Sequence, residues 1–212
     1  MSDSLNAMFG RGEVTFKRKK EVAGTPMTEL TVVQNKGEDY EQQILVKAWG
    51  KDWAKAAAAF KQGDRINFGG ELHRNEWEDG GNKNAKLEVD IQDGDDNAMI
   101  EKADEDGDHN EVRITGEVSW AGEIEKPTDT FQVRRIMVSV PKKTKTGQDI
   151  RLPYPVELLG ATAEGAFKVG TGVVLTGSVR NRFEFNEGDD PHRYYAEVVV
   201  SDKTDAHGIE AS

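Results

Sequence analysis

The 212-residue sequence contains no cysteine, and this absence excludes disulfide bonds and thiolate metal sites. No apolar run approaches the roughly 18 residues that a membrane-spanning helix needs. The first ten residues lack the charged and apolar regions of a secretion signal. These absences predict a soluble intracellular protein with no membrane partner.

The chain also lacks an excess of positive charge, since 28 basic and 39 acidic residues give a formal net charge of −11. The acidic excess is concentrated: the net charge is −1 over residues 1–92, −8 over residues 93–111 and −2 over residues 112–212. A nearly neutral domain can still carry a basic face, so the total charge does not exclude a nucleic-acid partner. Residues 93–111 are too acidic and too poor in apolar residues to pack, which predicts an inter-domain linker.

Alternating apolar and polar residues in the first 92 positions predict strands over residues 12–16, 27–33, 44–49, 66–77 and 86–91. Asp52 is a candidate N-cap for a short helix over residues 53–60, whose alanines favour helix. A turn is expected at residues 79–81. A strand, an inserted helix and a long hairpin in this order are typical of an OB-fold.

Within this stretch the segments AWGK and KQGDRINFGGELHRNEW, separated by the helix, resemble bacterial and phage single-stranded DNA-binding proteins of the SSB type. In that family one aromatic residue precedes the Gly-Lys pair, another follows basic residues on the long hairpin, and both stack on DNA bases. The resemblance covers most of residues 5–92 and places Trp49 and Trp77 at these two positions. It implies binding of single-stranded DNA without sequence preference and protection of the strand during replication, recombination or repair. It also implies a location in the cytoplasm of a bacterial or phage-infected cell.

The second half of the chain repeats the first. Residues 12–16 (GEVTF) correspond to residues 116–120 (GEVSW). The spaced residues Phe60, Gly63 and Gly70 recur as Phe167, Gly170 and Gly177, and Gly50 recurs as Gly160. Such a repeat indicates two copies of one fold. We therefore predict an all-β protein with two tandem five-stranded OB-fold barrels, each with a short helix between strands 3 and 4. The expected domains are residues 1–92, an acidic linker over residues 93–111, and residues 112–212 with a short C-terminal tail.

Candidate contacts with nucleic acid are aromatic rings, which stack on bases, and cations, which bind phosphates. In the first copy they are Trp49, Trp77, Lys47, His73 and Arg74, together with the run Lys17, Arg18, Lys19 and Lys20, which we expect in the loop after the first strand. In the second copy they are Arg134, Arg135, Lys142, Lys143, Arg180, Arg182, Phe183 and Phe185. Lys47 and Trp49 correspond to Glu157 and Leu159, so the second copy is expected to bind more weakly or to be a structural partner.

No pattern indicates catalysis, a metal site or a cofactor, because the four histidines are scattered and no nucleophile motif is present. We therefore expect a non-enzymatic protein. The alternatives are a protein–protein adaptor of a replication complex and, less in keeping with the sequence, a carboxylate-dependent nuclease. Four OB-folds per assembly are common in the family, which implies a homodimer of this chain. The family's acidic tail with a hydrophobic end, which recruits replication and repair proteins, has no match in residues 205–212.

Overall fold

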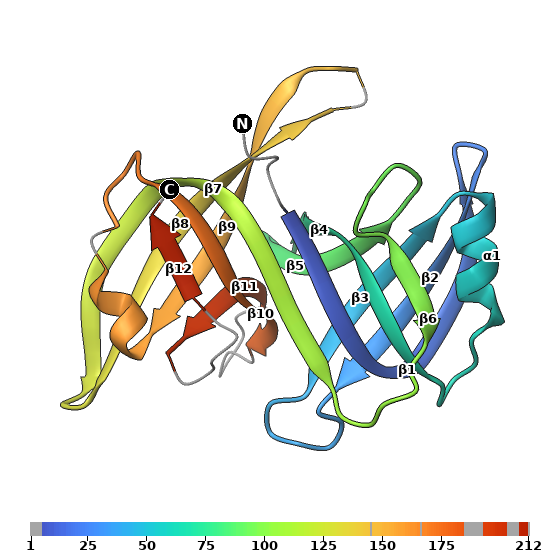
Figure 1. The fold of residues 1–212 in the computed structure, drawn as a ribbon, viewed down its shortest axis with the longest axis horizontal. Helices are drawn as coiled ribbons and strands as arrows, with labels where there is room; N and C mark the ends of the chain where they lie inside the picture. The colour runs from blue at the N-terminus through green and yellow to red at the C-terminus, as the bar shows by residue number, and fades with distance from the viewer. Residues whose placement is uncertain (1–5, 145, 166, 185–192, 203–207, 212) are drawn as a thin grey trace. The chain divides into compact units, whose positions relative to one another are not determined.

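The computed structural model describes residues 6–144, 146–165, 167–184, 193–202 and 208–211. Figure 1 shows the fold, in which strands dominate and a helix follows the third strand. In chain order the elements are β1 (Asn6–Val22), β2 (Thr25–Gln34), β3 (Gln42–Trp49), α1 (Lys51–Ala59), β4 (Arg65–Asp79), β5 (Asn82–Ile91), β6 (Met99–Lys102), β7 (His109–Thr128), β8 (Phe131–Lys143), β9 (Asp149–Leu159), the 3-10 helix η1 (Gly160–Glu164), β10 (Gly172–Glu184), β11 (Arg193–Ser201) and β12 (Gly208–Ala211). This architecture confirms the predicted fold class.

The chain forms two compact units. The first unit contains residues 7–110 and 181–195, and the second contains residues 1–6, 111–180 and 196–212. The change of unit near residue 111 lies at the end of the predicted linker. The repeat did not predict that residues 181–195, which belong to the second copy by sequence, are part of the first unit.

Five strands close a ring in the first unit. β1 pairs with β2 and β4, β2 pairs with β3, and β5 pairs with both β3 and β4. The β3–β5 pairing is parallel and the other four are antiparallel. Alternate side chains fill the ring, as Ile44, Val46 and Ala48 of β3 show, each of them fully buried. One residue, Gly50, separates β3 from α1, and it is the N-cap of the helix in place of the predicted Asp52.

The second unit repeats this ring. β7 pairs with β8 and β10, β8 pairs with β9, β9 pairs in parallel with β11, and β10 and β11 are neighbours. The short η1 helix follows β9 as α1 follows β3. Tyr154 is among the largest fully buried side chains, and its hydroxyl accepts a 3.1 Å hydrogen bond from Asn6 Nδ2. The two copies therefore share strand order and pairing as well as sequence spacing.

Two glycines of the first copy recur in the second copy for a physical reason. Gly63 and Gly170 adopt φ values of +91° and +89°, which L side chains rarely adopt. A Cβ atom at Gly70 or at Gly177 would collide with a backbone carbonyl oxygen of β5 or β11, respectively. Each pair thus marks the same feature of both copies, first a turn and then a close approach of two strands.

The segments predicted as linker and tail both contain a strand. β6 pairs with residues 66–69 of β4, and β12 pairs with residues 173–176 of β10. These are equivalent places, because Gly70 and Gly177 follow them directly. The prediction that residues 93–111 do not pack is therefore wrong for β6. The paired backbone satisfies hydrogen bonds that a solvated linker would leave to water.

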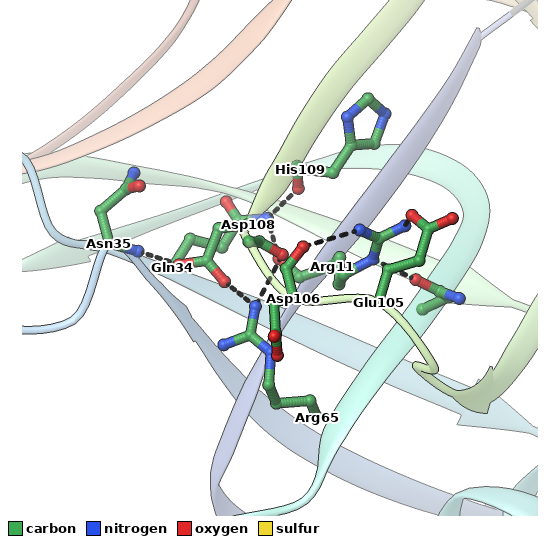
Figure 2. A network of polar contacts seen from close by, with 10 residues as sticks. Arg11, Gln34, Asn35, Arg65, Glu105, Asp106, Asp108 and His109 are labelled. Atoms are coloured by element: carbon green, nitrogen blue, oxygen red, sulfur yellow. Dashed lines mark hydrogen bonds and ion pairs between the residues drawn. The ribbon is translucent and has the colours of Figure 1, made fainter.

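Arginine side chains of β1 and β4 bind the acidic residues that follow β6, as Figure 2 shows. Arg11 forms a 2.7 Å ion pair with the exposed Glu105. Arg65 contacts Asp108 at 2.5 Å, and the second Asp108 oxygen accepts a hydrogen bond from the Asn35 N–H. These pairs compensate the repulsion between neighbouring carboxylates, which explains why so acidic a segment lies along the ring.

Candidate nucleic-acid interface

The outward face of β3 carries Lys47 and Trp49, as the alternation predicted, and both are half-buried. Trp49 Nε1 donates a 3.2 Å hydrogen bond to Asp90 on the neighbouring β5, which holds the ring while part of it stays exposed. Lys47 forms an ion pair with Glu88, whose side chain is only 3% exposed. Because a buried carboxylate needs such a partner, Lys47 neutralises Glu88 and adds no net positive charge to this face.

Trp77 lies near the end of β4, where that strand pairs with β5, and its side chain is half-buried. Arg74, three residues earlier, forms an ion pair with the exposed Glu76. His73 is half-buried, and in the part of the chain that the structure describes its Nδ1 has no hydrogen-bond partner. The positive charge of Arg74 is therefore offset by the Glu76 carboxylate. The ring of Trp77 is the main candidate contact on this hairpin.

The ring of Trp77 contacts a second aromatic ring of the first unit, that of Tyr194. The ring centroids are 5.6 Å apart with an interplanar angle of 47°. Lys86 Nζ lies 4.1 Å from the centroid of Tyr194, a cation–π geometry. Burial lowers the pKa of Lys86, and the charge of Glu88 opposes this shift. A pocket of about 430 Å³ opens beside these rings, and Tyr195 lines it too.

Sequence reasoning missed Tyr194 and Tyr195. The doublet is visible in the sequence after the second long hairpin, but the repeat assigned it to the second copy, at positions equivalent to Ala85 and Lys86 of β5. Its partner Trp77 is more than one hundred residues away in sequence. Only the tertiary structure places the two together.

The run of four cations lies within β1 and not in a loop, which corrects the prediction. Lys17 Nζ donates to the carbonyl oxygens of Ala58 and Phe60 at 2.7 and 2.5 Å, at the C-terminal end of α1. Lys20 forms a 2.6 Å ion pair with Glu29. The prediction considered only residues close in sequence. It therefore missed the partners of Lys17, at the end of α1, and of Lys20, on β2.

Three exposed cations of this region, Lys19, Lys51 and Lys55, line a groove of about 300 Å³. Arg18 is exposed on β1, as is Lys19 at the groove itself. Lys51 and Lys55 reach the groove from exposed positions on α1. These two lysines are not among the contacts predicted from the sequence, although their four-residue spacing places them on one helix face.

Replacement of Lys17 by methionine is expected to lower the free energy of unfolding by about 1.5–3 kcal/mol, because two hydrogen bonds from a charged donor to the end of α1 are lost. Urea denaturation measures this difference. The matched control is Lys19→Met, which removes an exposed ammonium of the same strand and should leave stability within about 0.5 kcal/mol. Equal stability of the two variants would contradict the structural role of Lys17.

In the second unit, Arg134 is a structural residue. Its guanidinium donates to the carbonyl oxygens of Gly122, Gly165 and Phe167 at 3.0, 2.7 and 3.3 Å. Arg135 is exposed and lies 3.4 Å from the exposed Glu125. Arg134 thus joins β7, β8 and the segment after η1, and its donors are used within the protein.

Arg180 binds two buried carboxylates, those of Glu157 and Glu197. Their side chains are 7% and 2% exposed. Burial raises the pKa of Glu197, Arg180 opposes that shift, and the neighbouring Glu157 adds to it. Strand pairing makes Glu197 equivalent to Glu88, so both copies keep a buried carboxylate here and differ in the strand that supplies its cation.

The remaining predicted contacts lie toward the ends of long hairpins. Lys142 is half-buried and Lys143 is exposed at the end of β8, and Arg182 is exposed on β10. Phe183 belongs to β10, but its side chain is outside what the structure describes. Phe185 also lies outside the described residues. Among the predicted contacts, Trp77 and Arg74 line the pocket and Lys19 and Lys20 line the groove, both within the first unit.

The described residues contain no cluster of three or more His, Asp or Glu side chains with the arrangement of a metal site. None of the helices formed by these residues has the length and apolar character needed to cross a membrane.

The structure is similar to two crystal structures from Thermus aquaticus. One is the wild-type single-stranded DNA-binding protein, at a TM-score of 0.72 and 16% identity over 100% of this chain and 94% of that chain. The other is a deletion variant of that protein with an arginine-to-alanine substitution, at a TM-score of 0.73 and 17% identity over 100% of this chain and 96% of that chain. No protein-family model and no curated protein sequence matches the chain. At this identity the likeness establishes the shared fold, with two OB-folds in one chain.

Proposed function

We propose that this protein binds single-stranded DNA without sequence preference, by stacking bases on Trp77 and Trp49. The observation that carries the proposal is the half-buried Trp77 at an aromatic-lined pocket on the long hairpin of an OB-fold ring. Stacking is tolerant of sequence because every base has a π-face. The Thermus aquaticus protein, which shares the whole fold, is a single-stranded DNA-binding protein.

Phosphate binding in this proposal uses four exposed cations of β1 and α1, which are Arg18, Lys19, Lys51 and Lys55. Lys17 and Lys47 are engaged within the protein and contribute little. Arg134 and Arg180 of the second unit are likewise engaged. The second copy is accordingly the weaker binder and mainly a structural partner.

The protein acts without catalysis in this proposal, and protects single strands during replication, recombination or repair in a bacterial or phage-infected cell. Two OB-folds per chain would give four in a homodimer, the assembly that the resemblance implies. Light scattering of the intact protein measures this state directly, with and without an oligonucleotide.

Titration of the intact protein with oligo-dT tests the binding proposal. Stacking should quench tryptophan emission, and the logarithm of the affinity should fall with the logarithm of salt concentration with a slope of about −3, from four phosphate contacts at about −0.7 each. Duplex DNA of the same length should compete poorly. An affinity that does not change with salt, or equal competition by the duplex, would contradict the proposal.

The alternative is a protein–protein adaptor, which is favoured by the internal engagement of the second copy's arginines. The same titration separates the two functions, because an adaptor gives no quenching by oligo-dT. Loss of intact oligonucleotide over time in the presence of magnesium would instead indicate a nuclease.

A further inference from the structure

The segment over residues 181–195 is hydrogen-bonded to the ring of the first unit at both of its described ends. Asn181 Oδ1 accepts from the Leu87 N–H at 3.0 Å, and its Nδ2 donates to the Leu87 and Gln43 carbonyls at 3.1 and 3.2 Å. The Asn181 N–H donates to Gln42 Oε1 at 2.8 Å. One side-chain amide thus pairs with the backbone of β5 and β3 in the way that another strand would.

The other described end is held in the same manner. The Tyr194 N–H donates a 2.8 Å hydrogen bond to Oδ1 of Asn84, which is 4% exposed. Asn84 Nδ2 donates in turn to the Asn82 carbonyl at 3.1 Å, so its amide orientation is fixed from both sides. These contacts place the ring of Tyr194 beside that of Trp77.

The pocket beside these rings has the character of a site for a flat, uncharged group. Rings of Trp77, Tyr194 and Tyr195 line it, and its charged residues include both signs, with Arg74 and Lys83 set against Glu76 and Glu78. The two cations and two carboxylates balance, so the pocket has no net charge that would draw a phosphate inside, whereas the rings attract a π-system. The amide of Asn84, which also lines the pocket, is already engaged, so it does not select one base over another.

We propose that Tyr194 and Tyr195 complete a nucleobase pocket around Trp77, so that the second copy's hairpin segment supplies part of the first copy's binding site. This inference rests on the proposed function. A base of the single strand enters the pocket and stacks against the rings, while its phosphates stay at the mouth. The second copy therefore contributes to affinity through two tyrosines and not through its own β9, where the buried Glu157, paired with Arg180, stands at the position of Lys47.

The test uses the full chain and four variants: Tyr194→Ala, Tyr194→Leu, Tyr194→Phe and Tyr195→Ala. Anisotropy of a labelled oligo-dT measures affinity, and thermal unfolding shows that each variant is folded. We expect Tyr194→Ala and Tyr194→Leu to bind about 5- to 150-fold more weakly, the range for loss of one stacked ring, with a smaller loss for Tyr195→Ala. Tyr194→Phe should bind within about twofold of the wild type because the ring is kept.

Tyr194→Leu separates stacking from packing, since leucine retains apolar bulk beside Trp77 without a π-face. Wild-type affinity of a folded Tyr194→Leu variant would overturn the inference. A second measurement is independent of stability: an oligonucleotide with 5-bromodeoxyuridine is photocrosslinked to the wild-type protein, and the peptides are mapped by mass spectrometry. Crosslinks to Tyr194 or Tyr195 support the pocket, and crosslinks confined to peptides outside it overturn the inference.

Different results would contradict the tyrosine pocket and the proposed DNA-binding function. If the wild type binds oligo-dT and Trp77→Ala binds weakly, but the tyrosine variants bind normally, the pocket is wrong and the proposed function stands. If the wild type does not bind oligo-dT, the proposed function and the pocket are both wrong. Simultaneous loss in Trp77→Ala and Tyr194→Ala, with a double variant no weaker than the worse single one, would show that the rings form one site.

Discussion

Replacement of Arg180 by methionine is expected to lower the free energy of unfolding by about 3–5 kcal/mol at neutral pH, the range for breaking a buried ion pair by removing one partner. Glu157 and Glu197 would both remain in the second unit without a cation, their side chains 7% and 2% exposed. Urea or thermal denaturation of the variant measures the loss. Arg180 is also a predicted contact with nucleic acid, so a stability effect of this size separates the two roles.

The loss should depend on pH in a defined direction. Burial already raises the pKa of Glu197 above its ordinary value of 4.5, and Arg180 opposes that shift. Without Arg180 the pKa in the folded state rises further, so the folded state holds a proton that the unfolded state releases. Protonation therefore favours folding, and the variant should recover stability as pH falls through the raised folded pKa toward 4.5.

The matched control is Arg135→Met, which removes an arginine from an ion pair with Glu125 in which both side chains are about half exposed. A surface pair contributes about 0–1 kcal/mol, so this variant should unfold nearly as the wild type does. If Arg180→Met were as stable as Arg135→Met and bound oligo-dT more weakly, Arg180 would be a phosphate contact and the buried cluster would be unimportant.

Trp77→Ala is expected to weaken oligo-dT binding by about 1–3 kcal/mol, and Trp49→Ala to do so within the same range, because each removes one ring on which a base stacks. Both side chains are half-buried at the ring's outer surface, so the fold should survive. Anisotropy of a labelled oligonucleotide measures affinity, and circular dichroism verifies that the variants are folded.

Trp120 provides the control, because it is a tryptophan of the second unit that is 53% exposed. Trp120→Ala should leave affinity unchanged if binding is concentrated in the first unit. An unfolded Trp77→Ala or Trp49→Ala variant would show that the tryptophan concerned belongs to the core. A loss in Trp120→Ala equal to that in Trp77→Ala would place a second stacking surface on the other copy.

The ring architecture and its duplication could be predicted from the sequence. Alternation in residues 44–49 predicted which side chains of β3 face inward, since a strand turns successive residues to opposite sides. Glycines at equivalent positions predicted the second copy, because the backbone at Gly63 and Gly170 and the space at Gly70 and Gly177 accept no other residue easily. These features depend on short segments, and short segments are visible in a sequence.

Which cations are paired within the protein and which aromatic rings are in contact could not be predicted from the sequence. In the sequence, nothing distinguishes Lys17, Lys47 and Arg180 from exposed cations. Their partners come from other elements that the fold brings close. The β6 and β12 strands have four residues each, too few for alternation to be recognised, and they exist because β4 and β10 offer a backbone edge. Tyr194 meets Trp77 because residues 181–195 belong to the first unit. Contacts between distant segments follow from how the chain closes on itself, and no local pattern encodes them.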